Sequence, residues 1–146
     1  MGKLKEIRNF VEDVTGVRPV IYKKRDDWAT YLCGKEHMEM SVPANFDEKD
    51  YRDHAFRKNF CDRCSIAKGF SNVTLSILHE CGHFMTQEIF CFGAYAKYRD
   101  NAGTDMTEYM AIPYEMIATQ WAICWLNNPT NRKIAKRFEK KFFKKG

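Results

Sequence analysis

A five-residue run in the middle of the chain has the residue types and the spacing of a metal site. His79-Glu80-Cys81-Gly82-His83 reads H-E-x-x-H. On an α-helix, residues four apart lie one turn above each other on the same face, so both imidazoles could bind one zinc ion. Glu80 follows the first histidine directly and could act as general base on a water at that metal. Outside a helix, the same spacing would be a coincidence.

The flanking sequence predicts the helix that this site requires. Ser71 or Asn72 can cap the first free backbone N–H groups, and no proline interrupts residues 73–90. Apolar residues surround much of the helix, which is typical of a helix buried in the core. Gly82 is less favourable than alanine in a helix interior by about 1 kcal/mol. Close packing or access to the metal would offset this, and the sequence leaves both explanations open.

A zinc hydrolase needs a third protein ligand and an open coordination position. Glu115 is the best candidate, because Pro113 just before it suits the first turn of a new helix. The face that begins with Glu115 continues at helical spacing with small residues: Ala118, Thr119 and Ala122. A second helix could therefore lie close to the first and direct one carboxylate at the metal. Glu108 is the rival ligand. In the alternative interpretation Glu115 binds no metal, and its negative charge stabilises the N-terminus of its own helix.

These two segments resemble a known family of metallopeptidases. H-E-C-G-H and E-M-I-A-T-Q-W-A are similar to the gluzincin pattern, in which HExxH is followed by a helix reading E-x-x-A-D/N-x-F/W-A. The likeness extends to minigluzincin domains and to ImmA/IrrE-type phage and stress-response peptidases, and it covers about residues 71–126. It implies one Zn²⁺ ion held by His79, His83 and Glu115, with Glu80 as the catalytic base of peptide-bond hydrolysis.

Thr119 departs from the family pattern that this resemblance suggests. It stands where the family commonly has an acidic or amide residue that orients the first histidine. A hydroxyl can accept the same hydrogen bond but carries no charge. Residues that orient a metal ligand typically change affinity or activity by about 10–100-fold, so Thr119 bears on catalytic power more than on metal binding.

The rest of the chain predicts a small α+β domain spanning residues 1–146. Residues 3–15 have the apolar spacing of an amphipathic helix, which Gly16 ends. Residues 20–22, 28–33 and 36–42 are strand candidates and would form a short antiparallel sheet of two or three strands. This order matches the minigluzincin layout: an N-terminal helix, a sheet, the HExxH helix, the glutamate helix and a basic C-terminal helix.

The third strand candidate alternates polar and apolar side chains, which is typical of a half-buried strand. In the wider family, a strand at the edge of the cleft pairs with an extended substrate peptide. The resemblance therefore implies a substrate-binding edge through main-chain hydrogen bonds, formed by Glu36, His37, Met38, Glu39 and Met40. The alternative is an ordinary surface strand.

Several segments allow more than one interpretation. Residues 47–58 could form a short helix over the cleft or a mobile lid. Cys61 and Cys64 form a single C-x-x-C, which is a weak metal signal because no second pair follows; His54 could complete such a site. The six cysteines are best taken as reduced and mostly buried. A donor to the developing oxyanion could be Tyr109 or Tyr114, with Tyr95, Tyr98 and His54 as further candidates.

Composition places few limits on the partners. The 146 residues are 45% hydrophobic and carry a net charge of +5. No stretch has the length of a membrane span or the pattern of a secretory signal, so we expect a cytoplasmic protein that acts on a protein or peptide substrate without a membrane. Residues 131–146 are rich in lysine and arginine and predict a basic helix whose apolar stripe packs on the domain. Binding of nucleic acid by this basic helix is the more specific interpretation. The alternative to a peptidase is a catalytically weak, metal-stabilised regulatory or nucleic-acid-binding module.

Overall fold

The structure, a computed structural model, describes residues 2–25, 28–32, 37–43, 46, 54–87 and 113–144. Its helices are α1 (Gly2–Thr15), α2 (His54–Arg63), the short 3-10 helix η1 (Ser65–Gly69), α3 (Asn72–Thr86), α6 (Pro113–Leu126) and α7 (Pro129–Phe142). The strands are β1 (Val20–Arg25), β2 (Ala29–Leu32) and β3 (Met38–Pro43). The predicted α+β class is confirmed.

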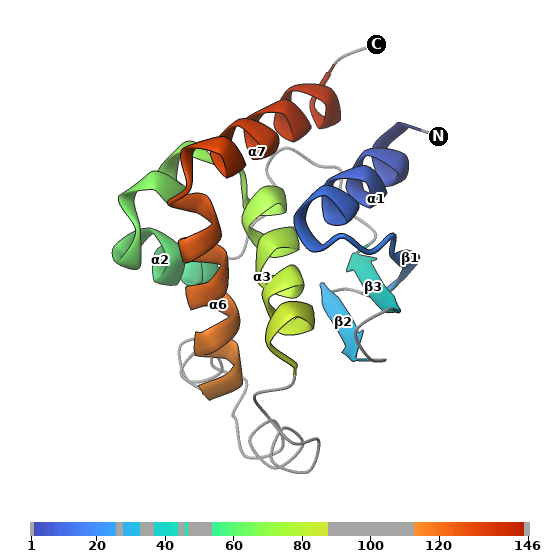
Figure 1. The fold of residues 1–146 in the computed structure, drawn as a ribbon, viewed down its shortest axis with the longest axis horizontal. Helices are drawn as coiled ribbons and strands as arrows, with labels where there is room; N and C mark the ends of the chain where they lie inside the picture. The colour runs from blue at the N-terminus through green and yellow to red at the C-terminus, as the bar shows by residue number, and fades with distance from the viewer. Residues whose placement is uncertain are drawn as a thin grey trace.

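Helix α3 is the centre of the fold (Figure 1). Helix α6 lies along one side of it, while α1 and the small sheet lie on the other side. All residues of α3 except Asn72 and Met85 are buried, as its apolar surroundings predict. The hydroxyl of Ser71 caps the helix by accepting a hydrogen bond from the backbone N–H of Thr74 at 3.1 Å. The HExxH run therefore lies on a regular, buried helix.

The sheet is mixed, so the expectation of an antiparallel sheet is wrong. Its strand order is β1-β3-β2, with β3 parallel to β1 and antiparallel to β2. Consecutive strands usually pair, but here β3 separates β1 from β2. The side chains of Met38, Met40 and Val42 on β3 are fully buried. The most buried strand thus takes the central position, where a neighbour on each side completes its backbone hydrogen bonds.

The central position of β3 also corrects the prediction of a substrate-binding edge at residues 36–42. Both sides of β3 are paired with other strands, so its main chain is not at an edge of the sheet. Met38 and Met40 point into the core, whereas His37 is exposed, 3.0 Å from the carboxylate of Glu39. The outer strands are β1 and β2, and β2 is the one in contact with α3.

Helix α7 packs across the N-terminal end of α3 and along α1 (Figure 1). Asn128 caps it, with Pro129 in the first turn. Phe138 stacks on Phe10 of α1 with ring centroids 4.3 Å apart. Glu139 accepts hydrogen bonds from the Ser71 backbone N–H and the Thr74 hydroxyl, both at 2.6 Å. The predicted basic helix therefore closes the first turn of α3 as well as burying its apolar stripe.

Within the described residues, no helix is both long and apolar enough to cross a membrane. Of residues 47–58, for which a short helix or a mobile lid was possible, residues 54–58 belong to α2 (His54–Arg63), and residues 47–53 lie outside the described part of the chain. Cys61 and Cys64 are free thiols.

Helices α3 and α6 approach each other closely at Gly82. A Cβ atom built on Gly82 would lie 2.3 Å from the carbonyl oxygen of Ala118 and 2.9 Å from its carbonyl carbon. Backbone atoms of a helix cannot yield by a rotamer change. Close packing of the two helices therefore explains the glycine in this helix interior, which the sequence left open.

We expect Gly82→Ala to destabilise the fold even though alanine is the better helix former. Overpacking typically costs about 1–3 kcal/mol, which corresponds to a fall in melting temperature of roughly 3–9 °C for a chain of this size. Thermal unfolding followed by circular dichroism measures this. Gly2→Ala is the matched control, because nothing lies within 4 Å of a Cβ atom there. An unchanged or raised melting temperature for Gly82→Ala would contradict the close approach.

Candidate metal centre

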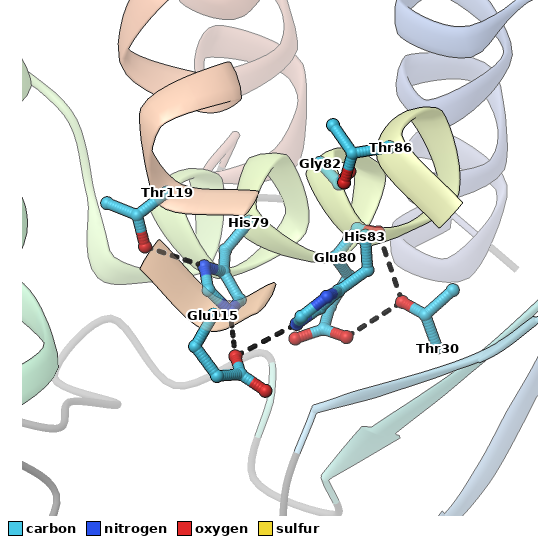
Figure 2. Close-up of polar contacts among 8 residues, drawn as sticks. All are labelled: Thr30, His79, Glu80, Gly82, His83, Thr86, Glu115 and Thr119. Atoms are coloured by element: carbon cyan, nitrogen blue, oxygen red, sulfur yellow. Dashed lines mark hydrogen bonds and ion pairs between the residues drawn. The ribbon is translucent and has the colours of Figure 1, made fainter. Parts of the chain in front are cut away.

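The three predicted ligands meet at one point between α3 and α6 (Figure 2). His79 Nε2 lies 2.7 Å from Glu115 Oε1, and His83 Nε2 lies 2.9 Å from the same oxygen. Each residue offers one ligand atom, and these atoms all lie within 4.8 Å of one another. Two imidazoles and one carboxylate form the His₂Glu donor set that catalytic zinc sites use.

Local sequence explains how each side chain reaches this point. His79 and His83 are one helical turn apart on α3, with ring centroids 4.7 Å apart. Pro113 begins α6, which places Glu115 in its first turn. The contact between Gly82 and Ala118 brings the two helix backbones together beside His83.

Glu115 is a buried charge whose surroundings favour ionisation. Its side chain is only 1% exposed. Burial by itself would raise the pKa of this carboxyl, but the neighbouring His83 and His79 outweigh burial through charge and hydrogen bonding, and they hold the pKa well below its ordinary value. The second oxygen, Oε2, is buried and has no hydrogen-bond partner among the described residues. Buried carboxylate oxygens are normally satisfied, so this atom is available to a ligand.

Thr119 fixes the orientation of His79. Its hydroxyl oxygen lies 2.9 Å from His79 Nδ1. When Nδ1–H donates to Thr119, the lone pair of Nε2 faces Glu115 and is available to a metal. This is the contact that the resemblance implied for Thr119. The ring of Phe56 from α2 packs edge-on against the His79 ring, with ring centroids 5.4 Å apart, and limits the rotation of His79 further.

Glu80 is held by a residue, Thr30, that no sequence pattern indicated. The hydroxyl of Thr30, on β2, donates to Glu80 Oε1 at 2.7 Å and also lies 3.2 Å from the Glu80 carbonyl oxygen. The Glu80 carboxylate is on the sheet side of the histidines, whereas Glu115 approaches from α6 (Figure 2). Thr30 and Glu80 are 50 residues apart, so no local motif connects them.

Among the other candidate residues, Tyr114 lies beside this cluster, and several others lie outside the described residues. Tyr114 is buried, with its ring 5.6 Å from the His83 ring. Glu36, Tyr95, Tyr98, Glu108 and Tyr109 lie outside the described residues, as does the side chain of His54. Burial raises the pKa of the Cys81 thiol, with the nearby Glu80 charge as a smaller cause, so Cys81 stays protonated and is a poor metal ligand.

No other group of three ligand-type side chains comes together in the described part of the chain. Cys61 and Cys64 are therefore without a third ligand there, and the Cys64 thiol lies 3.9 Å from the Asn127 side-chain oxygen. Comparison with family models, curated protein sequences and solved structures found no match to this chain. The site must accordingly be judged on its own geometry and chemistry.

We expect the purified protein to bind one zinc ion per chain through His79, His83 and Glu115. Glu115→Gln should remove stoichiometric zinc, because an amide oxygen is a weaker, uncharged ligand. Metal analysis by mass spectrometry after dialysis measures this, and zinc should raise the melting temperature of the wild type but not that of Glu115→Gln.

Glu12→Gln serves as the control, since this exposed carboxylate pairs with Arg18 far from the cluster. Equal zinc content in Glu115→Gln and the wild type would remove Glu115 from the ligand set. Absence of zinc from the reconstituted wild type would contradict the site as a whole.

Proposed function

We propose that this chain is a zinc-dependent peptidase. The observation that carries the proposal is the convergence of His79, His83 and Glu115, with Glu80 held on the adjacent side by Thr30. A purely structural metal site has no need for a separately positioned carboxylate. A hydrolytic site needs one, because water must lose a proton as it attacks.

A zinc ion bound at this site would polarise a peptide carbonyl and lower the pKa of the water that attacks it. The chain's own residues then manage the protons. Glu80 accepts a proton as the water oxygen forms its bond to the carbonyl carbon. It passes that proton to the amide nitrogen when the carbon–nitrogen bond breaks, so the products are a carboxylic acid and an amine.

Thr30 would act as the positioning residue for this base. Its hydroxyl donates to Glu80 Oε1, so the other oxygen of the carboxylate is the one that handles the transferred proton. A hydrogen bond to an ionised group is typically worth about 1.5–3 kcal/mol. Holding the base in one orientation reduces the entropy that the reaction would otherwise lose.

The same strand supplies a route for the substrate. Among the described residues, β2 pairs only with β3, and it carries Thr30 next to the base. An extended peptide that adds to the outer side of β2 would use main-chain hydrogen bonds and would run past Glu80. We therefore propose β2, instead of residues 36–42, as the substrate-binding edge.

We expect Glu80→Gln to retain zinc and to lose turnover by at least about 10²-fold, since general-base catalysis typically contributes 10²–10⁴-fold. A peptide library incubated with the zinc-loaded protein and analysed by mass spectrometry identifies cleaved sequences, and one of these then serves for kinetics. Equal rates in Glu80→Gln and the wild type would eliminate the assignment of Glu80 as base.

Thr30→Val should lower kcat by roughly 10–100-fold, because the lost hydrogen bond to a charged group is worth about 1.5–3 kcal/mol. KM, zinc content and melting temperature should change little, because valine has nearly the same shape as threonine. Thr30→Ser keeps the hydroxyl and should restore most of kcat. If serine and valine reduced kcat equally, packing on β2 and not the hydrogen bond would be responsible.

A further inference from the structure

Helix α7 and the two residues after it carry an unusual excess of positive charge. Residues 129–144 contain seven lysines and arginines and a single acid, Glu139. That acid faces inward and caps α3 through Ser71 and Thr74. No carboxylate of α7 itself therefore neutralises its solvent-facing side.

Two of the cations, Arg132 and Lys136, lie in the same row of α7 as Glu139, here called the inner row. Arg132 donates to the carbonyl oxygens of Leu126 and Asn127 at 3.1 and 3.2 Å, which closes the end of α6. Lys136 donates to the Gly69 carbonyl and lies over the Phe70 ring at 4.4 Å. The spacing of Arg132, Lys136 and Glu139 is that of one helical face.

Four other cations form a different face, here called the outer face: Lys133, Arg137, Lys140 and Lys141. All four are exposed, and none of these side chains makes a hydrogen bond or an ion pair with a described residue. Elsewhere on the surface, Arg18 pairs with Glu12 and Lys58 pairs with Asp62. At 100° per residue, the outer face covers an arc of roughly 100° and a length of about 12 Å.

The positive surface continues beyond α7. Lys141 and Lys144 line a hollow of about 790 Å³ together with Lys3, Arg8 and Lys23 from α1 and β1. Among the described residues of that lining, Glu6 is the one acid. Glu6 and Asp13 line a smaller hollow together with Arg137 and Lys141, so acidic side chains neighbour the outer face on its α1 side.

We propose that the outer face binds the phosphate backbone of duplex nucleic acid without reading its sequence. Over about 12 Å, one strand of B-form DNA presents three to four phosphates along the helix axis. Flexible lysine side chains act as point charges, which suits a regular polyanion better than a ligand of fixed shape. Backbone contacts of this kind position a protein on nucleic acid but carry no sequence information.

Two other anionic partners fit the surface less well. A helix that inserts into a lipid surface needs an exposed apolar face, but Phe138 and Phe142 of α7 are buried in the core. Single-stranded nucleic acid is typically bound by aromatic rings on which bases stack, and Phe46 and Phe142 beneath the hollow are likewise buried.

Fluorescence polarisation with a labelled 30-base-pair DNA duplex of arbitrary sequence tests the proposal on the full-length chain. We expect binding whose affinity falls about 10²-fold between 50 and 200 mM salt, as contact with four phosphates implies. In the quadruple variant Lys133→Gln, Arg137→Gln, Lys140→Gln and Lys141→Gln, the magnitude of the slope of log affinity against log salt should decrease by about 3.6.

The matched control is Lys5→Gln, Arg18→Gln, Lys58→Gln and Lys68→Gln, which removes three lysines and one arginine from exposed positions elsewhere. It should retain most of the binding, and Glu115→Gln should retain all of it, since the surface does not depend on the metal site. Equal loss in both quadruple variants would overturn the proposal. So would binding to phosphatidylserine vesicles or poly-glutamate at least as tight as to the duplex, or no binding by the wild type at 50 mM salt.

Discussion

The contact between Gly82 and Ala118 is the constraint on which the rest of the structure depends. The Ala118 carbonyl occupies the space that any side chain at position 82 would need. Because Gly82 lies between the two histidines and Ala118 lies one turn after Glu115, the same approach that packs the helices also brings the three ligand atoms together. Helix packing and ligand geometry thus depend on the same contact.

Bringing Glu115 to this point has an energetic penalty that packing alone does not repay. A carboxylate that is 1% exposed loses its hydration, and two imidazoles restore only part of it. One oxygen accepts both hydrogen bonds while Oε2 has no partner among the described residues. An apolar side chain there would stabilise the fold more. A buried carboxylate with an unsatisfied oxygen beside this close helix contact favours a ligand-binding role.

Sequence patterns predicted the structural features that depend on residues close to one another in the chain. The Ser71 cap, the buried α3 and the first turn of α6 at Pro113 each follow from residues within one or two helical turns. The order of the strands does not, because it depends on how deeply each strand is buried, and the parallel pairing of β1 with β3 was therefore missed. Thr30 was missed for the same reason: its contact with Glu80 exists only once the sheet is docked on α3.

Helix α3 contacts both regions to which we assign functions, the metal site and α7, and its length separates them. Thr74, near its N-terminus, contacts Glu139 on the inner row of α7, while His83 lies nine residues further along, a rise of about 13 Å. A change in the inner row would disturb the α3 cap and could reach the metal site through the helix. A change on the outer face touches no such contact. Selection could therefore adjust the charge of α7 without altering the chemistry at Glu80.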